Sequence, residues 1–517
     1  ASYMRGGRSV VFRGWKPFLR EAQRDIGANW DMAAARAHDA IVNSGWLSGM
    51  IDQAVANTVG GGLRMKPQPE NEVLGQSREW ATAWSKSVSQ KFELWARTPA
   101  DCDIEGHRTL ARMQADAFRA WIPTGEILAE IPWRRRAWSR TGTKVRVLPP
   151  QRLSRSSDPM RRIVNGVSLD ADGMPVGYLV KRQDEFGSSS DDMVNARDRY
   201  GRQRVVHVFN GPIGTCRGIG VLTPVLQVIR QFDQFSDATL TKAIVSAVFA
   251  ATIESDAPTE EVLEGLLTPK ERTQMALDGV SQMEAFIDAT GGFYEGASLD
   301  LGINGRLSHM FPGDKLTFNA VEGPGPDQEK FFKMLLREIA RALGMSYESA
   351  TGDFAGATYY SLGKSGDEIF SITKMRRDNV VVPFSQPIYE AWLEEEIEAG
   401  RIEFPGGIVG FHSNRAAACR AEWHGSPKNV ADVLKHAKAQ SEWVKMGVKS
   451  ISMVAEELGY DYEDVCQAIA SDADLQAQYG IERPLIFSIG APSTPPTEDP
   501  DENDGEKPGG GAEDDDA

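Results

Sequence analysis

Hydroxyl side chains gather in one segment of the sequence, between an amphipathic stretch that ends at Leu343 and the return of helical periodicity after Gly363. A hydroxyl nucleophile needs a general base to accept its proton. No histidine occurs between His309 and His412, so the segment contains no such base of its own. We therefore interpret residues 345–364 as a long functional loop without a catalytic set. Its candidate residues are Ser346, Tyr347, Ser349, Thr351, Asp353, Thr358, Tyr359, Tyr360, Ser361 and Lys364.

A glycine-rich turn is the strongest enzyme-like pattern. Residues 205–226, VVHVFNGPIGTCRGIGVLTPVL, are typical of a strand, a turn containing Gly218 and Gly220, and a helix. A dinucleotide-binding fold requires that order, but Thr223 stands where the third glycine is expected and no acidic residue ends a second strand about twenty residues later. An enzyme built on this turn, nucleotide-dependent or hydrolytic, remains the alternative interpretation.

Three residues that could bind a metal lie close together, at His412, Cys419 and His424. No fourth ligand follows at a telling distance, and the four cysteines of the chain include no C-x-x-C pair. We predict that the protein has no metal site, no disulfide framework, no cofactor and no catalytic residues.

Basic residues form two distinct patterns. One is a helical stripe that steps by three, four and four positions through Lys330, Lys333, Arg337 and Arg341, opposite an apolar line of Phe331, Leu335, Ile339 and Leu343. A solvated face explains such a stripe, and contacts with phosphates or with another subunit remain open. The second pattern, WRRRAWSR at residues 133–140, interleaves indoles with guanidiniums and suits phosphates or acidic partners.

The charge of the chain is concentrated at its C-terminal end. The formal net charge is −16, and residues 491–517 contribute ten acidic side chains and one lysine, a net −9, which leaves −7 for the other 490 residues. A segment so acidic and so poor in apolar residues is predicted to be disordered. We find no apolar run of 18 residues that could span a bilayer, and the basic N-terminus does not resemble a signal peptide.

Helical and strand-like patterns alternate in blocks. Residues 1–120 are predicted to be helical, with one helix over 77–95. Alternating Val and Ile then predict a β-rich block over 125–211, with a hairpin turn at the DADG sequence of residues 170–173. Two long helices follow on either side of a mixed insert. A later long helical segment must kink or break at its two prolines, Pro383 and Pro387.

These segments together resemble one known family, the portal proteins of tailed bacteriophages, and within it the lambda-like branch. The resemblance extends from about residue 39 to residue 479. It is carried by NSGWLSGMIDQAVANTVGGGLRMKP, VVHVF, RGIGVLTPVLQVIRQFDQFSDATLTKA, PGDKLTFN, LLREIARALGMSYESATGDFAGATYYS and AEWHGSPKNVADVLKHAKAQSEWVKMGVKSISMVAEELGYDYEDV.

The resemblance implies an α+β, mainly helical, subunit that assembles into a ring. The parts that it implies are a helical and β-rich wing at 1–221, a first stem helix at 222–254, a clip at 255–326, a second stem helix at 327–344, a tunnel loop at 345–364, a kinked helix and wing return at 365–425, a helical crown at 426–480 and a disordered acidic tail at 481–517.

The same resemblance implies a function. Portal proteins form a ring at one capsid vertex, through which a motor loads DNA and from which the DNA leaves. The implied protein partners are eleven further copies of the chain, a terminase motor, the major capsid or scaffold protein and a head-completion protein. The ring is also implied to bind double-stranded DNA without sequence specificity, and no binding to a membrane is implied. The implied location is the virion, and the host cytoplasm during assembly. A hydroxyl-rich tunnel loop with few positive charges would let DNA slide past.

The rival interpretations are the enzyme on the Gly218 to Gly220 turn and a monomeric scaffold that binds charged partners.

Removing residues 491–517 should leave folding and assembly unchanged, because a segment without apolar residues contributes nothing to a core. Size-exclusion chromatography with light scattering compares the truncated and full chains. A truncated chain that aggregates, or that no longer forms the oligomer of the full chain, would show that the segment is structural.

Overall fold

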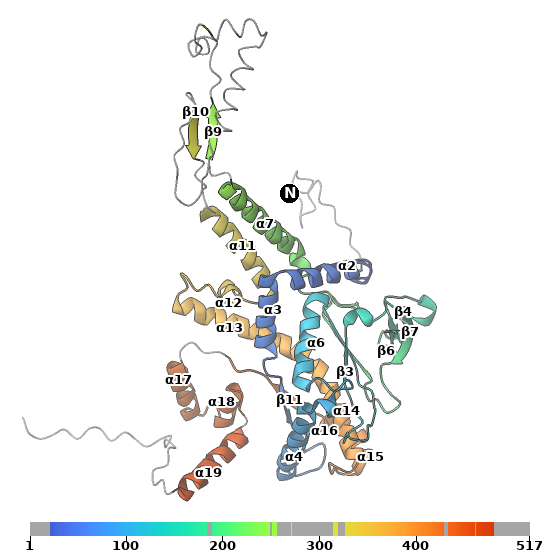
Figure 1. Ribbon diagram of the computed structural model, residues 1–517. Helices are drawn as coiled ribbons and strands as arrows, with labels where there is room; N and C mark the ends of the chain where they lie inside the picture. The colour runs from blue at the N-terminus through green and yellow to red at the C-terminus, as the bar shows by residue number, and fades with distance from the viewer. Residues whose placement is uncertain are drawn as a thin grey trace, which may run out of the picture. The chain divides into compact units, whose positions relative to one another are not determined.

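The protein is mainly helical with several small antiparallel sheets, as the α+β prediction requires (Figure 1). The computed structural model describes residues 21–183, 189–248, 251–255, 270, 314–318, 326–428, 433–460 and 462–479. Most of the predicted clip and the whole predicted acidic tail lie outside these residues. Within them, no helix combines the length and the hydrophobicity of a membrane span.

The elements follow one another in this order: α2 (Ala22–Asn43), α3 (Gly45–Thr58), β1 (Arg64–Pro67), α4 (Arg78–Arg97), α5 (Pro99–Cys102), α6 (Leu110–Thr124), β2 (Glu126–Glu130), β3 (Arg146–Leu148), β4 (Ile163–Val164), β5 (Val167–Leu169), β6 (Pro175–Gln183), β7 (Ser189–Asn195), β8 (Val205–Phe209), α7 (Leu226–Val248), β9 (Ala251–Ser255), β10 (Asp314–Phe318), α11 (Pro326–Leu343), α12 (Tyr347–Thr351), α13 (Tyr359–Arg376), α14 (Val382–Glu398), α15 (Gly407–Ser413), α16 (Arg415–Ala418), β11 (Ala421–His424), α17 (Val433–Lys445), α18 (Ile451–Glu457) and α19 (Tyr462–Gln478).

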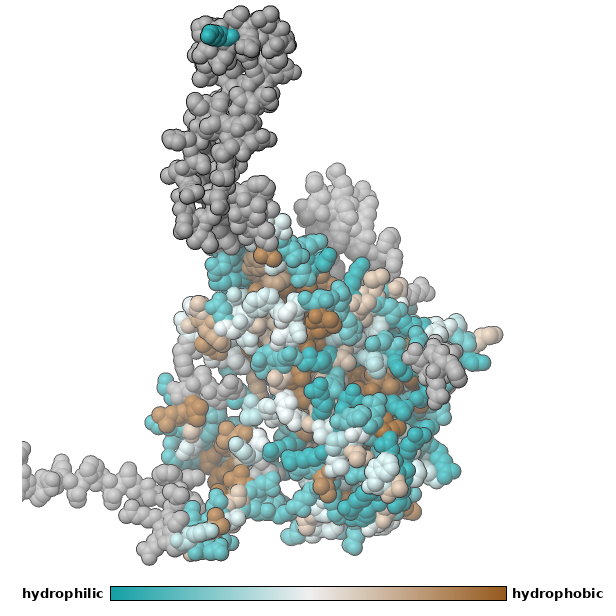
Figure 2. Space-filling model, viewed as in Figure 1, coloured by the Kyte–Doolittle hydropathy of each residue, from teal (hydrophilic) through white to brown (hydrophobic). Residues whose placement is uncertain are grey.

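The chain forms two compact units, Ala1–Ala439 and Gln440–Ala517. The boundary lies inside α17, whereas the predicted crown begins at residue 426. In the second unit, turns at Gly447 and Gly459, both with positive φ, separate the helices as predicted. No apolar side chain among the described residues of this unit is buried, and Trp443 and Met453 are among its exposed residues. Figure 2 shows hydrophobic residues gathered over α17 and α18 on the face in view.

The predicted β-rich block divides into two sheets in the first unit. One has the strand order β3-β2-β8 and the other the order β4-β5-β6-β7, with every pairing antiparallel. The DADG sequence joins β5 to β6 as predicted: the Asp170 carboxylate accepts hydrogen bonds from the backbone of Asp172 and Met174, and Gly173 has φ +89°. The hairpin prediction is therefore confirmed.

The main core of the first unit lies where α4, α6 and α14 meet. Phe92 of α4 is 4% exposed, and its ring centroid lies within 5.1 to 6.1 Å of those of Trp95, Tyr389, Trp392 and Trp423. Most of these pairs meet edge to face, the arrangement that aromatic quadrupoles favour. Segments roughly 300 residues apart in the sequence are joined in this way.

The two predicted long helices, α7 and α11, pack against each other (Figure 1). Phe235 of α7 lies 5.0 Å from Phe331 and 4.8 Å from Phe332 of α11, and Phe232 also contacts Phe332. The first helix was predicted to extend to residue 254, but Ala251–Ser255 is strand β9, paired with β10. The β-branched Thr252 and Ile253 favour that extended pairing over a continued helix.

The predicted bend at the prolines is a π-helical turn between α13 and α14. Residues Arg377–Val381 form it, and the Val382 N–H donates to the carbonyl of Arg377 five residues earlier. Pro383 has no N–H to continue the regular ladder, so the wider turn accommodates it while Pro387 stays inside α14. The helical segment therefore changes register without breaking.

Phe92→Ala should destabilise the first unit by about 3 to 5 kcal/mol, because it leaves a cavity among four aromatic rings. The measurement is the thermal midpoint of unfolding followed by near-ultraviolet circular dichroism. Leu94→Ala in the same helix is the matched control, because Leu94 is 63% exposed. Equal losses in the two variants would contradict the central role of the aromatic cluster.

Candidate functional site

The predicted loop at residues 345–364 is largely helical. Gly344, with φ +75°, ends α11, and the short helix α12 then runs to Thr351. Gly352 and Gly356 turn the chain with φ +72° and +79°, and α13 begins at Tyr359. The prediction of a long loop over residues 345–364 was therefore wrong, and Gly363, after which helical periodicity was expected to return, lies inside α13. Within the segment, residues 345–346 and 352–358 lack a helical conformation.

Local helix capping explains most of the hydroxyl groups in this segment. Ser346 accepts a hydrogen bond from the Ser349 N–H at 3.2 Å and so caps α12. Thr358 and Ser361 form a reciprocal capping box at the start of α13. Thr351 donates to the Tyr347 carbonyl at 2.8 Å. Hydroxyl side chains that resembled candidate functional groups in the sequence therefore form hydrogen bonds with the backbone at helix ends.

Asp353 connects the segment to the stripe on α11. Its carboxylate accepts hydrogen bonds from the Ala355 N–H at 3.0 Å and the Tyr347 hydroxyl at 3.3 Å, and lies 3.7 Å from the Lys333 ammonium. The Ala355 N–H, followed by Lys333 and Tyr347, holds the pKa of Asp353 below its ordinary value. The carboxylate is therefore ionised and fixed in place at neutral pH.

Intrachain partners neutralise much of the basic stripe. Lys333 pairs with Glu329 at 2.7 Å as well as with Asp353, and Arg341 pairs with Glu368 at 3.2 Å. Arg337 lies over the Tyr347 ring, 5.3 Å from its centroid. Lys330, the fourth residue of the stripe, is exposed. The predicted stripe exists as a face of α11, and its Lys333 and Arg341 are ion-paired within the chain, although the Arg341 side chain stays 72% exposed.

Contacts from three helices hold this region in place. The Arg376 guanidinium donates to the carbonyls of Leu343 and Ala342 at the end of α11 and lies over the Trp121 ring of α6. A Cβ at Gly344 would lie 2.7 Å from Ile372, so glycine is needed both for its φ and for this close approach. A shallow pocket lies between the start of α3, at Gly45 to Gln53, and α12.

Exposed aromatic residues flank the turn between α12 and α13. Phe354 is 56% exposed and Tyr360 is 74% exposed. Among the other candidate residues, Lys364 lies on the first turns of α13, and Tyr359 begins that helix. The structure thus brings the candidates together along one edge, formed by the end of α11, α12 and the start of α13.

The Gly218 to Gly220 turn has a structural explanation that does not require a bound nucleotide. A Cβ at Gly218 would lie 2.1 Å from the Gly125 carbonyl, and one at Gly220 would lie 2.1 Å from the Pro123 carbonyl. The Gly218 N–H donates to the Glu126 carboxylate at 2.8 Å. These glycines permit two backbones to touch, and a carboxylate of the chain already occupies the position that a phosphate would need.

Glu126 forms a buried ion pair beneath this turn. Its carboxylate accepts a hydrogen bond from Arg217 at 2.7 Å and lies 3.8 Å from His207. Burial alone would raise the pKa of Glu126, but the contacts with His207 and Arg217 outweigh that effect and hold it below its ordinary value. The Arg217 guanidinium also lies 5.0 Å from the Trp30 ring of α2.

The three predicted metal-ligand candidates have separate environments. His412 lies 3.8 Å from Glu394, and His424 lies 3.5 Å from Glu422. Cys419 is buried, which raises the pKa of its thiol well above the ordinary value. Within the described ranges, no group of three or more His, Cys, Asp or Glu side chains is arranged to hold a metal ion.

Sequence reasoning missed a set of buried glutamates in α14. Residues 394–396 resemble a solvated face in the sequence, yet all three are less than 9% exposed. The backbone N–H groups of Gly142 and Thr143 donate to Glu395 at 2.6 and 2.7 Å, and Arg401 donates two hydrogen bonds to the next glutamate. The partners of Glu395 lie about 250 residues away in the sequence, so no local pattern could have identified its burial, whereas Arg401 is only five residues from Glu396.

Comparison with known proteins defines the class to which this fold and site belong, the phage portal proteins. The family model described as "Phage portal protein, lambda family" matches residues 9–377, more than half of the chain. The chain belongs to this lambda family of portal proteins. The resemblance drawn from the sequence is therefore confirmed.

Relatives and solved structures show similarity over most of the chain. Portal protein B of Escherichia phage lambda is 26% identical over 475 residues, which cover 90% of this chain and 88% of that protein. The portal protein of Escherichia phage N15 is 25% identical over 468 residues, which cover 89% of this chain and 87% of that protein. A chain in the neck of an empty gene transfer agent particle matches with a TM-score of 0.41, 15% identity and coverage of 86% and 96%. One from the virion of a native gene transfer agent particle matches with a TM-score of 0.38, 16% identity and coverage of 80% and 99%.

Glu126→Gln should destabilise the protein by about 3 to 5 kcal/mol at pH 7, because it leaves the buried Arg217 without its counter-charge. The folded-state pKa of Glu126 is lowered, so its ionised form stabilises the fold fully above the unfolded value of about 4.3. That stabilisation is lost as the pH falls below this value, and the difference between the two proteins should shrink there.

The measurement is the thermal midpoint of the variant and of the unaltered protein, and the difference between the two is compared at pH 7 and at pH 3.5. Glu93→Gln is the control, because Glu93 pairs with Arg97 on the surface and should change little at either pH. A constant difference for Glu126→Gln at both pH values would contradict the assigned charge.

Proposed function

We propose that the chain is one subunit of a closed ring of twelve copies, around a channel for double-stranded DNA at one vertex of a capsid. Membership of the lambda portal family supports this proposal. Side chains on the long helix pair add to it: Leu240 of α7 and Met334 and Phe331 of α11 are 61%, 53% and 42% exposed. Apolar groups on long helices favour burial against a neighbouring copy, and a head-to-tail contact that repeats with rotation closes a ring.

The edge formed by residues 345–364 is the part that we place in the channel. The observation that carries this assignment is the low net charge of residues 345–364. The segment contains two acidic residues, Glu348 and Asp353, against one basic residue, Lys364, which gives a net charge of −1. The neighbouring cations Lys333 and Arg341 are paired within the chain. Each free cation that neutralises a phosphate strengthens binding to DNA, so this edge suits a duplex that must move past without being held.

The remaining parts take roles by the same proposal. The helices α7 and α11 form the stem, and residues 255–326 form the clip that faces a terminase motor and a head-completion protein. The wing, residues 1–221, meets the capsid or scaffold protein, and the helices after residue 426 form the crown. The chain has no enzyme activity of its own, and a separate motor supplies the energy. It acts in the virion and assembles in the host cytoplasm.

Lysines placed on the turn between α12 and α13 should slow the movement of DNA. Ala355 is exposed and Ala357 is partly exposed, so Ala355→Lys with Ala357→Lys should leave ring formation unchanged. Across a ring the change adds cations that bind phosphates, so packaging and ejection should be severalfold slower at low salt and recover as salt increases. Packaging of labelled DNA into purified capsids measures the rate.

The matched control is Ala355→Ser with Ala357→Ser, which adds hydroxyls without charge. A lysine variant that packages at the serine variant's rate, at every salt concentration, would show that this turn does not meet DNA. A lysine variant that no longer forms rings would place the turn in a subunit contact.

A further inference from the structure

The loop at residues 133–140 presents an aromatic and cationic surface that the proposed channel does not use. Trp133 and Trp138 are 61% and 74% exposed. Arg134, Arg135 and Arg140 are also exposed, and their guanidiniums form no ion pair within the described part of the chain. Two indoles and three unpaired guanidiniums therefore lie within eight residues.

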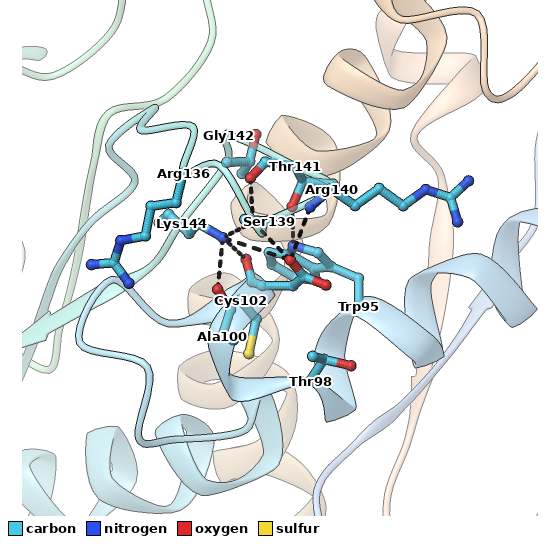
Figure 3. A network of polar contacts seen from close by, with 12 residues as sticks. Trp95, Thr98, Ala100, Cys102, Arg136, Ser139, Arg140, Thr141, Gly142 and Lys144 are labelled. Carbon is cyan, nitrogen blue, oxygen red and sulfur yellow. Dashed lines mark hydrogen bonds and ion pairs between the residues drawn. The ribbon is translucent and has the colours of Figure 1, made fainter.

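A buried polar network fixes the base of this loop. The Lys144 side chain is fully buried, and its ammonium donates to the carbonyls of Ala100 and Asp101 at 2.9 and 2.7 Å and to the Ser139 hydroxyl at 2.5 Å. Ser139 in turn donates to the Asp101 carboxylate at 2.7 Å. Figure 3 shows these groups converging, while the Arg140 side chain points away from them.

The other side of the loop is held equally firmly. Glu395 accepts from the N–H groups of Gly142 and Thr143, and Trp133 forms an antiparallel bridge with Thr143. The absence of a side chain at Gly142 lets the Trp133 indole pack on it, because a Cβ there would lie 2.5 Å from that ring. A surface held in one conformation loses little entropy on binding.

The chemistry of this surface favours an acidic peptide over DNA. Tryptophan and arginine are the residues most enriched at the centres of protein interfaces. An indole gains most from a nucleic acid by stacking on an unpaired base, which a duplex does not offer. Proline-rich segments, in contrast, pack their rings into aromatic surfaces, and carboxylates pair with guanidiniums.

The chain itself contains a segment with both properties. Residues 491–517, APSTPPTEDPDENDGEKPGGGAEDDDA, combine a net charge of −9 with five prolines, and contain no aromatic residue that would compete for the indoles. Six of the ten acidic residues fall within 498–506, directly after Pro495 and Pro496 and around Pro500.

We propose that the loop at residues 133–140 is a docking site for this acidic, proline-containing C-terminal segment of another copy of the chain. Prolines at 495, 496 and 500 pack on Trp133 and Trp138, and the carboxylates that follow pair with Arg134, Arg135 and Arg140. The docked segment covers a surface that would otherwise attract any polyanion. The docked segment does not contribute to the fold, which agrees with the expectation that the chain without residues 491–517 folds normally.

The test is binding of a fluorescein-labelled peptide of residues 491–517 to the chain that ends at residue 490, measured by anisotropy at about 50 mM salt. We expect saturable binding that weakens about tenfold or more in Trp133→Ala with Trp138→Ala, and similarly in Arg134→Ala with Arg135→Ala and Arg140→Ala. Met160→Ala with Arg161→Ala is the matched control, because Met160 is 97% exposed and Arg161 is an exposed arginine elsewhere. This control should bind the peptide within about twofold of the unaltered protein.

Two further measurements do not depend on the folding of variants. A peptide of the same composition in scrambled order should bind more weakly. The full chain should also bind the labelled peptide more weakly than the truncated chain, because C-terminal segments of other copies compete for the loop. Equal binding of both peptides, or equal binding by the tryptophan variant and the Met160 control, would overturn the proposal. So would a duplex oligonucleotide that binds through the same residues while the peptide does not bind.

Discussion

The close contact between residues 217–221 and the end of α6 determines where the long helices lie. Gly218 and Gly220 let the two backbones touch, the Val221 N–H donates to the Ile122 carbonyl at 2.8 Å, and the Glu126 to Arg217 pair fixes the contact from below. The chain leaves this contact directly into α7, whose phenylalanines pack on α11. The end of α11 then returns to α6 through Arg376, which lies over Trp121. The position of the hydroxyl-rich edge therefore depends on a buried ion pair in the N-terminal half of the chain.

The same edge explains how a protein can surround DNA without holding it. A ring of many copies multiplies every surface charge, so a stripe of unpaired lysines and arginines would bind phosphates strongly. In this chain Glu329, Asp353 and Glu368 pair with two cations of that stripe, and Arg337 lies over Tyr347. Most of the hydroxyls form hydrogen bonds at the ends of α12 and α13, and these bonds stiffen the segment. On the proposed function, the duplex meets a firm edge with little net charge rather than a flexible, adhesive loop.

Much of the fold could be predicted from sequence because its signals are local. The hairpin at Asp170 to Gly173, the apolar line of α11 and the bend before Pro383 each follow from a few nearby residues. The helical state of residues 347–351 was missed because Ser and Thr are typical of both loops and helix caps, and only the structure distinguishes the two. The burial of Glu395 and Lys144 could not be predicted, because the backbone groups of Gly142, Thr143, Ala100 and Asp101 that compensate their charges lie elsewhere in the chain. The glycines at 218 and 220 were recognised as unusual, but their partner, the backbone at Pro123 and Gly125, is a tertiary contact that no motif encodes.

The central claim is that the turn between α12 and α13 faces DNA. Phe354, which is 56% exposed on that turn, can be replaced by a photo-crosslinking phenylalanine analogue in capsids that contain packaged DNA. The same analogue at Met160, which is 97% exposed and lies just before β4, serves as the reference position. After irradiation, the account predicts a portal protein to DNA crosslink from position 354 and only background from position 160. Equal crosslinking from both positions, or none from position 354 in fully packaged capsids, would contradict it.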